Sequence, residues 1–266
     1  MIKKYLDFWF SIQGIVQIIE LFEKEKHDIR FIGGCVRDAL LGNKSSDIDF
    51  AINCDPNITA NLLLKNKIEI LEYGKRYGTI TALIEKKNFE ITSLREDTNP
   101  DGRYSEVIFT DDWNKDALRR DFTFNAINID ARGNIEDYFD GQRDLMSQQI
   151  RFIGNIEERI QEDYLRILRY FRFLGLFEKP NLIEGYKETL YKYLPHVRKH
   201  IPNDRIRNEL LKMLKNKFVL NSVVDSKNPN QLNTLIKTIK HWWTEDQFEL
   251  GLRKCMNKIH ELIFNQ

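Results

Sequence analysis

The sequence contains very little cysteine: three residues in 266, at positions 35, 54 and 255. Their spacings match no zinc-binding pattern, and an odd number is a poor basis for a disulfide framework. We therefore expect reduced, buried or half-buried thiols in a protein of the cytoplasm. The five histidines include one i, i+4 pair, His196 and His200, but no cysteine or acidic residue stands at a metal-binding distance from it in the sequence. These histidines are expected on the surface or in the core.

The sequence also lacks an excess of either charge. Its 41 basic and 40 acidic residues give a formal net charge of +1. A strong basic excess often marks nucleic-acid-binding proteins, so this balance does not predict RNA binding. It does not exclude RNA binding either, because the field depends on where charges cluster. A hydrophobic content of 42% with 30% charged residues is ordinary for a folded protein and excludes collagen, coiled coil and wholesale disorder.

No long hydrophobic run is clean enough to cross a membrane or to act as a signal sequence. The apolar stretch at residues 5–22 is interrupted by polar residues at positions 7, 13, 17 and 20, and no small-residue cleavage site follows it. We expect a buried amphipathic helix over residues 5–26, no membrane partner and a cytoplasmic location.

Hydrophobic periodicity divides the chain into two parts. Up to about residue 150, helical segments alternate with short β-rich runs, and from Asn155 onward the pattern is helical. The shift predicts an α+β protein, with a mixed β-sheet domain at residues 1–150 and an all-α region at residues 151–266. We expect strands at 29–32, 48–52, 68–72, 78–85 and 88–94, a hairpin turn at 86–88, helices at 36–41 and 57–64, a polar loop at 96–104 and a late linker at 225–230.

Two adjacent glycines form the first candidate site. Gly33 and Gly34 follow a predicted strand and open a helix, so that backbone N–H groups and a positive helix end face the same space, which suits a phosphate. Glycine lets the backbone approach a ligand closely, and Arg37 adds a charge-assisted contact to a triphosphate or ribose. Alone, this pattern more often marks only a tight strand-to-helix turn.

A pair of aspartates strengthens the glycine signal. Asp47 and Asp49 flank Ile48 in a predicted strand, where residues i and i+2 point to the same face. Two like charges so close are costly, and Mg²⁺ that bridges them to substrate phosphates removes that cost. Two metal ions can serve an in-line displacement by activating the attacking oxygen and the leaving pyrophosphate. A lone pair of this kind is unspecific and is often an exposed turn, but the glycine motif before it makes the combination informative.

Adjacent arginines form the second candidate site. Asp116 is followed by Arg119, Arg120 and Asp121. Such arginines can grip a triphosphate while a neighbouring carboxylate orients one guanidinium. The alternative is the salt-bridged start of a surface helix.

A third candidate lies at the start of a predicted helix. Asp163 and Arg166 are neighbours at i, i+3. Cytosine and adenine both offer an exocyclic amine beside a ring-nitrogen acceptor, which a carboxylate and a guanidinium complement, whereas guanine and uracil offer the reverse pattern. On spacing alone, a plain ion pair is the simpler interpretation. Arg169 and Arg172 continue the basic series and are candidates for phosphate contacts.

Together these motifs resemble the class II tRNA nucleotidyltransferases, the family of CCA-adding enzymes and bacterial poly(A) polymerases. The resemblance covers residues 29–177 in motif order. It rests on Gly33-Gly34-x-Val36-Arg37-Asp38, Asp47-x-Asp49, Arg119-Arg120-Asp121, Asp140-Gly141-x-x-Asp144-Leu145 and Glu162-Asp163-x-x-Arg166.

The resemblance implies a nucleotidyltransferase-type head domain, then a helical nucleotide-selecting neck and a shortened tRNA-binding region. It implies Mg²⁺ at Asp47 and Asp49, and stepwise addition of C, C and A to a tRNA 3′ end from CTP and ATP, with release of pyrophosphate. No protein partner is predicted. The residues implied in nucleotide binding are Gly33, Gly34, Arg37, Arg119, Arg120, Asp163, Arg166, Arg169 and Arg172.

Further expectations follow from the same resemblance. Glu90 is a candidate third carboxylate near the metals, and Arg103 lies in a loop, residues 96–106, that resembles the family's switch from C to A addition. About 90 residues follow Phe177, fewer than in typical members. Phosphate contacts there are assigned to Lys187, Lys192, Arg198, Lys199, Arg205, Arg207, Lys212, Lys215 and Lys217, although most such residues only form a solvated face.

Two groups of alternatives remain open at this point. The first is a relative that adds only CC, only A, or a poly(A) tail. The second is a non-catalytic tRNA-binding protein that kept the fold, although such a scaffold has no physical need for two metal carboxylates and a base-selecting pair.

Overall fold

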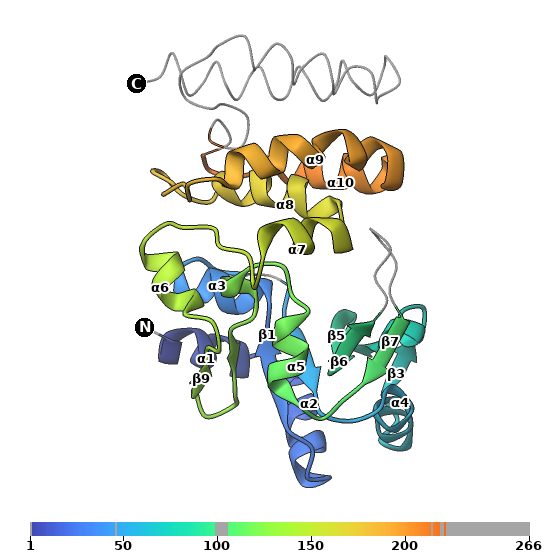
Figure 1. The fold of residues 1–266 in the computed structure, drawn as a ribbon. Helices are drawn as coiled ribbons and strands as arrows, with labels where there is room; N and C mark the ends of the chain where they lie inside the picture. The colour runs from blue at the N-terminus through green and yellow to red at the C-terminus, as the bar shows by residue number, and fades with distance from the viewer. Residues whose placement is uncertain (1, 46, 99–105, 214, 219–220, 222–266) are drawn as a thin grey trace, which may run out of the picture. The chain divides into compact units, whose positions relative to one another are not determined.

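The computed structural model describes residues 2–45, 47–98, 106–213, 215–218 and 221. The chain divides into two compact units, Met1–Glu162 and Asp163–Gln266. The first unit carries the strands and the described part of the second is helical, which confirms the predicted α+β class (Figure 1). The boundary between the two units falls between residues 162 and 163. The shift in sequence pattern had predicted a boundary near residue 150.

A seven-stranded mixed sheet, in the order β3-β4-β5-β2-β1-β8-β9, organises the first unit. Strands β2 and β5 pair in parallel, and the other neighbours in this sheet are antiparallel. The strands are β1 (Ile29–Ile32), β2 (Asp49–Ile52), β3 (Glu69–Leu71), β4 (Thr79–Ile84), β5 (Lys87–Ser93), β8 (Asn128–Ile129) and β9 (Ile135–Glu136).

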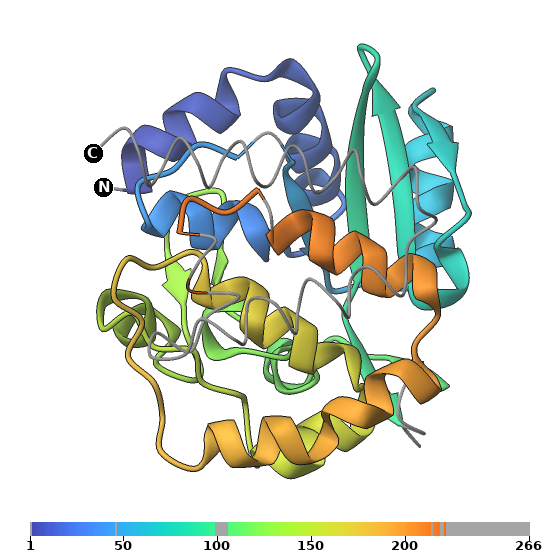
Figure 2. The ribbon, with the colours of Figure 1, turned by 90° about the horizontal axis from the view of Figure 1, so that it is seen from above.

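Strands β4 and β5 form a long hairpin (Figure 2). It turns one residue earlier than expected. Ile84 pairs with Lys87, so Glu85 and Lys86 form the turn, at φ values of 50° and 63°. Two consecutive residues of positive φ match the right-handed twist of the strands that they join. The sequence signal was missed because glycine or asparagine usually occupies these positions.

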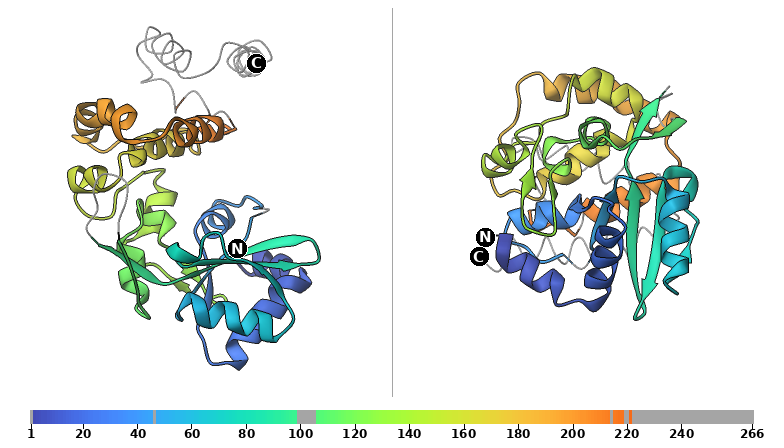
Figure 3. Two further views of the ribbon diagram at one scale, coloured as in Figure 1. Left: turned by 90° about the vertical axis from the view of Figure 1, so that its right-hand side faces the viewer. Right: turned by 90° about the horizontal axis from the view of Figure 1, so that it is seen from below.

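The two faces of the sheet differ in character. Phe31, Phe50 and Ile91 are fully buried on one face, because side chains alternate along each strand. Helices α2 (Gln13–Lys24) and α4 (Pro56–Lys65) lie on this side of the sheet (left view of Figure 3). The other face carries Arg30 and Asp49 beside the buried apolar residues Ile32 and Ala51.

The expected single helix over residues 5–26 is wrong in one respect: it is two helices. Helix α1 spans Ile2–Phe10, and α2 begins at Gln13. The break occurs where the hydroxyl of Ser11 donates to the carbonyl of Phe8 at 2.6 Å. It allows separate docking, since Trp9 packs on Phe31 with ring centroids 4.5 Å apart, and Gly14 lies so close to the Phe89 ring that a Cβ would stand 2.6 Å from it.

The expected loop at 96–104 was also wrong at its start. Strand β6 (Arg95–Thr98) pairs with β7 (Glu106–Phe109) in a separate two-stranded sheet. This strand could not be predicted from the sequence, because its four residues are polar, half-buried and show no apolar alternation. Arg103, Cys255 and the predicted linker at 225–230 lie outside the described residues.

Short helices complete the first unit. They are α3 (Gly34–Leu40), α5 (Trp113–Leu118), α6 (Gly141–Met146), α7 (Ile156–Glu162) and two 3₁₀ turns, Lys75–Tyr77 and Thr123–Asn125. Helix α3 confirms the predicted turn from a strand into a helix at the two glycines.

The described part of the second unit contains helices α8 (Leu165–Leu174), α9 (Tyr186–His200) and α10 (Asn203–Met213). Helix α8 contacts both other helices and buries Ile167 and Phe173 between charged residues. This alternation is the periodicity that predicted the helix. Among the described helices, none has both the length and the apolar character that crossing a bilayer requires.

Candidate active site

The glycine turn borders the carboxylate of Asp49. Gly33 joins β1 to α3 with a φ of 70°, a conformation that favours glycine. A Cβ built at Gly33 would stand 4.0 Å from Oδ2 of Asp49, and one at Gly34 would stand 3.7 Å from Nη2 of Arg37. The structure therefore brings together the glycines, Arg37 and Asp49, as the sequence predicted.

Three carboxylates gather around the start of β2. Asp49 pairs directly with Glu90 across the parallel strands β2 and β5, so the two side chains share one face. Burial, then the charges of Glu90 and Asp47, raise the pKa of Asp49 to about 6, and the charge of Arg120 only partly opposes this rise. Among the described residues, however, no three acidic, cysteine or histidine side chains form a ready-made metal cage. A cation here would take further ligands from water and phosphate, as Mg²⁺ commonly does.

The adjacent arginines are held by Asp116. Nε of Arg119 donates to Oδ1 of Asp116 at 2.8 Å, and Nη2 of Arg120 donates to Oδ2 at 2.8 Å. Burial alone would raise the pKa of Asp116, but the charges of Arg120 and Arg119 outweigh it and lower the pKa to about 2. The neighbour Asp121 instead accepts from the backbone N–H of Phe122 at 2.9 Å. Asp116, at i−3 from Arg119 and i−4 from Arg120, therefore orients both guanidinium groups.

Asn125 connects the glycine motif with the adjacent arginines, and the sequence did not predict this role. Its Oδ1 accepts from Arg37 at 3.2 Å, its backbone carbonyl accepts from Arg120 at 3.3 Å, and its Nδ2 donates to Asp121 at 2.9 Å. The residue is 7% exposed. The position of Asn125 directly after Phe122 and Phe124 was the available signal, because buried amides require hydrogen-bond partners.

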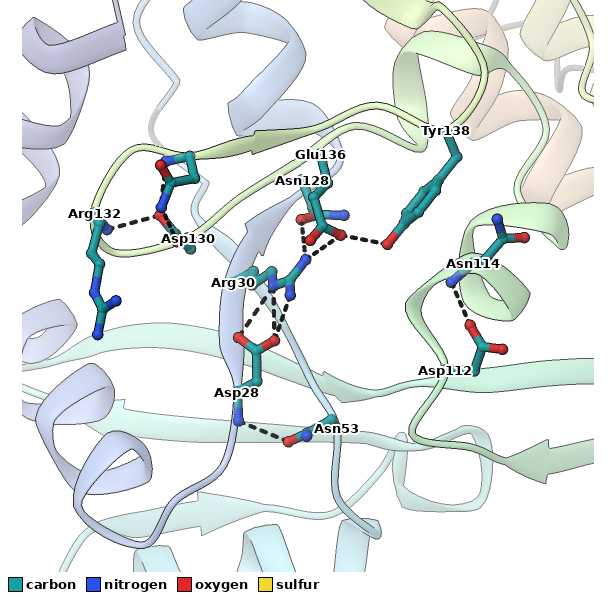
Figure 4. A network of polar contacts seen from close by, with 11 residues as sticks. Asp28, Arg30, Asn53, Asp112, Asn114, Asn128, Asp130, Arg132, Glu136 and Tyr138 are labelled. Carbon is teal, nitrogen blue, oxygen red and sulfur yellow. Dashed lines mark hydrogen bonds and ion pairs between the residues drawn. The ribbon is translucent and has the colours of Figure 1, made fainter.

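A charged network on the same face of the sheet anchors α5 (Figure 4). Arg30 donates to Asp28 from Nη2 at 2.6 Å and to Asn128 from Nη1 at 3.0 Å, and it forms an ion pair with Glu136. Its guanidinium stacks over the ring of Trp113, 4.1 Å from the centroid. Trp113 opens α5, so this cation–π contact helps to fix the helix that carries Asp116 and leads into Arg119.

The second unit carries the predicted base-selecting pair. Asp163 precedes α8, and its Oδ1 accepts from the N–H of Leu165, the first residue of the helix, at 2.9 Å. Burial raises the pKa of Asp163, against the opposing charges of Arg166, Arg169 and Arg205. Arg166 is 9% exposed. Arg166 is thus buried, and Asp163 is half-buried and tied by a hydrogen bond to the first residue of the helix.

The other two arginines of α8 lie on one aromatic ring. The guanidinium of Arg169 stands 5.6 Å from the centroid of Phe173, and that of Arg172 stands 4.3 Å from it. Arg172 also pairs with the buried carboxylate of Glu209, whose Oε2 is 3.0 Å from its Nε. Arg172 therefore already has a protein partner, which the sequence did not indicate.

A stack of rings adjoins Asp163. Tyr164 lies over His196 and His200 of α9, with ring centroids 5.0 and 4.7 Å apart, and the two histidines stack on each other at 5.6 Å. The sequence placed this histidine pair only on the surface or in the core. The i, i+4 spacing puts both on one face of α9, and Tyr164 is the partner that sequence could not supply.

The sheet, the glycine turn and the carboxylates define a nucleotidyltransferase head domain. A family model described as "Poly A polymerase head domain" matches residues 29–151. The chain belongs to the class II tRNA nucleotidyltransferase family, together with CCA-adding enzymes.

Similar proteins include the mitochondrial CCA tRNA nucleotidyltransferase 1 of Homo sapiens, which is 45% identical over 76% of this chain and 47% of that protein. The CCA-adding enzyme of Staphylococcus saprophyticus is 34% identical over 77% of this chain and 50% of that protein. The crystal structure of the Bacillus stearothermophilus CCA-adding enzyme in complex with CTP has a TM-score of 0.70 at 30% identity, over 79% of this chain and 50% of that one. The chain spans about half the length of the curated relatives that it matches.

Proposed function

We propose that this protein transfers nucleotides to the 3′ end of tRNA, adding C, C and A from CTP and ATP with release of pyrophosphate. The observation that carries the proposal is the placement of Asp49 beside Gly33, Asp47 and Glu90, on a sheet face where Arg120 also acts on its charge. The relatives that match the chain are named for CCA addition, which supports the same reaction.

The acidic cluster fits a divalent cation. Asp49 carries a raised pKa because its charge is partly buried and faces two other carboxylates. Asp47 and Asp49 would hold Mg²⁺, with Glu90 beside them. When bound, the metal would activate the attacking 3′ oxygen and neutralise the leaving pyrophosphate.

The remaining predicted residues would bind the nucleotide. Gly33, Gly34 and Arg37 offer backbone N–H groups and a guanidinium to phosphates. Arg119 and Arg120, both fixed by Asp116, would grip the triphosphate of CTP or ATP. In the second unit, Asp163 would accept from the exocyclic amine of the base while Arg166 donates to its ring nitrogen. Arg169 and Arg172 would contribute positive charge near phosphates.

The RNA would be held through charge on the helices of the second unit. All nine basic residues assigned to this role from the sequence are exposed. Their contribution is expected to weaken as salt concentration rises. A cytoplasmic location stays a prediction from sequence, since the human relative is named as mitochondrial.

One assay tests the proposed activity. The purified protein is incubated with Mg²⁺ and a tRNA that ends before CCA, with CTP, ATP or both. Growth by three nucleotides that requires both substrates supports the proposal. Growth by two, by one or by a long A tail selects CC addition, A addition or poly(A) synthesis. Absence of growth in every condition favours the non-catalytic tRNA-binding alternative.

Affinity for Mg²⁺ should depend on pH. Because the pKa of Asp49 is raised to about 6, a proton competes with the cation below that pH. The apparent affinity should be constant above about pH 7 and fall by up to about tenfold per pH unit below about pH 6. Isothermal titration of Mg²⁺ into the protein with a non-hydrolysable nucleotide at pH 5, 6, 7 and 8 measures this. An affinity that is flat from pH 8 to 5 would contradict a metal at Asp49.

Nucleotide choice should depend on Asp163 and Arg166. Asp163→Asn keeps a carbonyl oxygen that can accept from the N–H of Leu165 but replaces the second acceptor by an amide donor, so preference for C and A over U and G should fall about 10- to 100-fold. Arg166→Met should act in the same direction. Incorporation of each of the four nucleotides measures the ratio. Unchanged choice in folded variants would remove the base-selecting role without removing the transfer reaction.

A further inference from the structure

One arginine that the sequence did not select contacts the backbone of the two adjacent arginines. Nη2 of Arg159, on α7, donates to the carbonyl oxygens of Arg119 and Arg120 at 2.8 and 2.7 Å. Both carbonyls lie beyond Leu118, where α5 ends, so α5 itself does not continue to supply N–H donors. A single guanidinium group therefore fixes two consecutive peptide groups.

Arg159 is itself held in place. Its Nη1 lies 2.5 Å from Oε2 of Glu162, one turn later on α7, and its side chain is 12% exposed. Burial and a carboxylate partner restrict the guanidinium to one orientation. The donors that face the two carbonyls are thus pre-organised and not the mobile end of a surface side chain.

The adjacent arginines are consequently fixed at both ends. Asp116 holds the guanidinium groups of Arg119 and Arg120, and Arg159 holds their backbone. Both constraints are needed to aim a side chain, because a shifted Cα moves the whole arginine even if its tip keeps a partner. Fixed donors lose less freedom when an anion binds between them.

We propose that Arg159 is a positioning residue for triphosphate binding, acting through the backbone of Arg119 and Arg120. The inference rests on the proposed function, in which these two arginines grip the triphosphate. It predicts an effect confined to ligands with a triphosphate. A merely structural arginine would change the affinity for all nucleotides alike, by unfolding part of the protein.

The test compares ATP with AMP. In Arg159→Met, which keeps the aliphatic stem but removes the donors, affinity for ATP measured by isothermal titration should fall about tenfold, while affinity for AMP should stay within about twofold. Arg159→Lys should show an intermediate loss, because an ammonium group can reach a carbonyl but cannot replace the fork. If the methionine variant does not fold, the lysine variant decides: an ATP-selective loss supports the proposal, and equal losses for both ligands overturn it.

Arg151 supplies a matched control. Like Arg159, it contacts both a carboxylate and a backbone carbonyl: it donates to Asp144 at 3.0 Å and to the carbonyl of Phe139 at 2.6 Å. Arg151→Met should leave the ratio of ATP to AMP affinity unchanged. Arg120→Met tests the triphosphate site itself, separately from the positioning role of Arg159. If it lowers ATP affinity and Arg159→Met does not, the positioning role is overturned; if Arg120→Met leaves ATP affinity unchanged, the assignment of the triphosphate site itself fails.

Discussion

Asp49→Asn is expected to lower the rate of nucleotide addition by about a thousandfold or more. In the proposed function Asp49 holds Mg²⁺, so its removal forfeits several kcal/mol of transition-state stabilisation, and each 1.36 kcal/mol corresponds to about a factor of ten in rate. Single-turnover addition of CTP to tRNA measures the loss. Excess Mg²⁺ should not restore the rate, because an amide oxygen carries no charge with which to balance the cation.

The same substitution should stabilise the fold. The pKa of Asp49 is raised to about 6, so in the folded state its charge is unfavourable relative to the unfolded chain. The penalty is absent below about pH 4, where the residue is protonated in both states, grows as pH rises through 6, and is constant above it. Asp49→Asn should therefore raise the free energy of unfolding by about 2 kcal/mol at pH 8 and by much less at pH 4. Urea unfolding at the two pH values measures the difference.

Glu69→Gln is a matched control for both effects. Glu69 is the first residue of β3, as Asp49 is of β2, but it is exposed. Its substitution should change neither the rate nor the stability appreciably. If the Asp49 variant is inactive and also less stable than wild type at pH 8, the charge of Asp49 does not destabilise the folded state. The carboxylate then has a structural role.

Local pattern was enough to predict most strands and the glycine turn. The runs at Ile29–Ile32 and around Phe50 alternate or are uniformly apolar, and short-range sterics decide such elements. The pairing of Asp49 with Glu90 was only suggested by resemblance, because it depends on the parallel register of β2 and β5 across 41 residues, from position 49 to position 90. Registers of this kind are set by the whole sheet.

The contacts of Asp116 and of Arg159 with the two adjacent arginines differ in whether the sequence could predict them. The grip of Asp116 on Arg119 and Arg120 follows from helical spacing, since residues at i+3 and i+4 share a face, and this periodicity was available. The contact of Arg159 with the same segment joins positions 40 and 39 residues apart in the chain. No local pattern encodes it, so it required the structure.

Asp116→Asn is expected to cause the largest loss of stability among these substitutions. The carboxylate is 4% exposed on its side chain and faces two guanidinium groups, so its neutralisation leaves two like charges close together and partly buried. Breaking a buried ion pair by removal of one partner costs about 3–5 kcal/mol. Nucleotide affinity should fall as well, because the two arginines would separate and lose the orientation that a triphosphate requires.

The pH dependence identifies the source of this loss. The pKa of Asp116 is lowered to about 2, below its unfolded value near 4, so its stabilising contribution is full above about pH 4 and disappears as pH falls from 4 to 2. The contribution from this shift alone is about 2 kcal/mol. Denaturant unfolding at pH 7, 4 and 3 should show wild type approaching the variant at acid pH. A difference that stays constant down to pH 3 would mean that lost packing, not lost charge, destabilises the variant.

Asp112→Asn, at the N-cap of the same helix, is the control for substitution of a neighbouring aspartate. Asp112 is exposed and caps α5 by accepting from the N–H of Asn114 at 2.8 Å, a role that asparagine performs about equally well. Its free energy of unfolding should match wild type. In the double variant Asp116→Asn with Arg119→Met, the total loss of stability should be smaller than the sum of the two single losses by about 1–2 kcal/mol, because removal of one guanidinium relieves the repulsion that the first substitution created. Strict additivity of the two losses would show that Asp116 does not act through the charges of this pair.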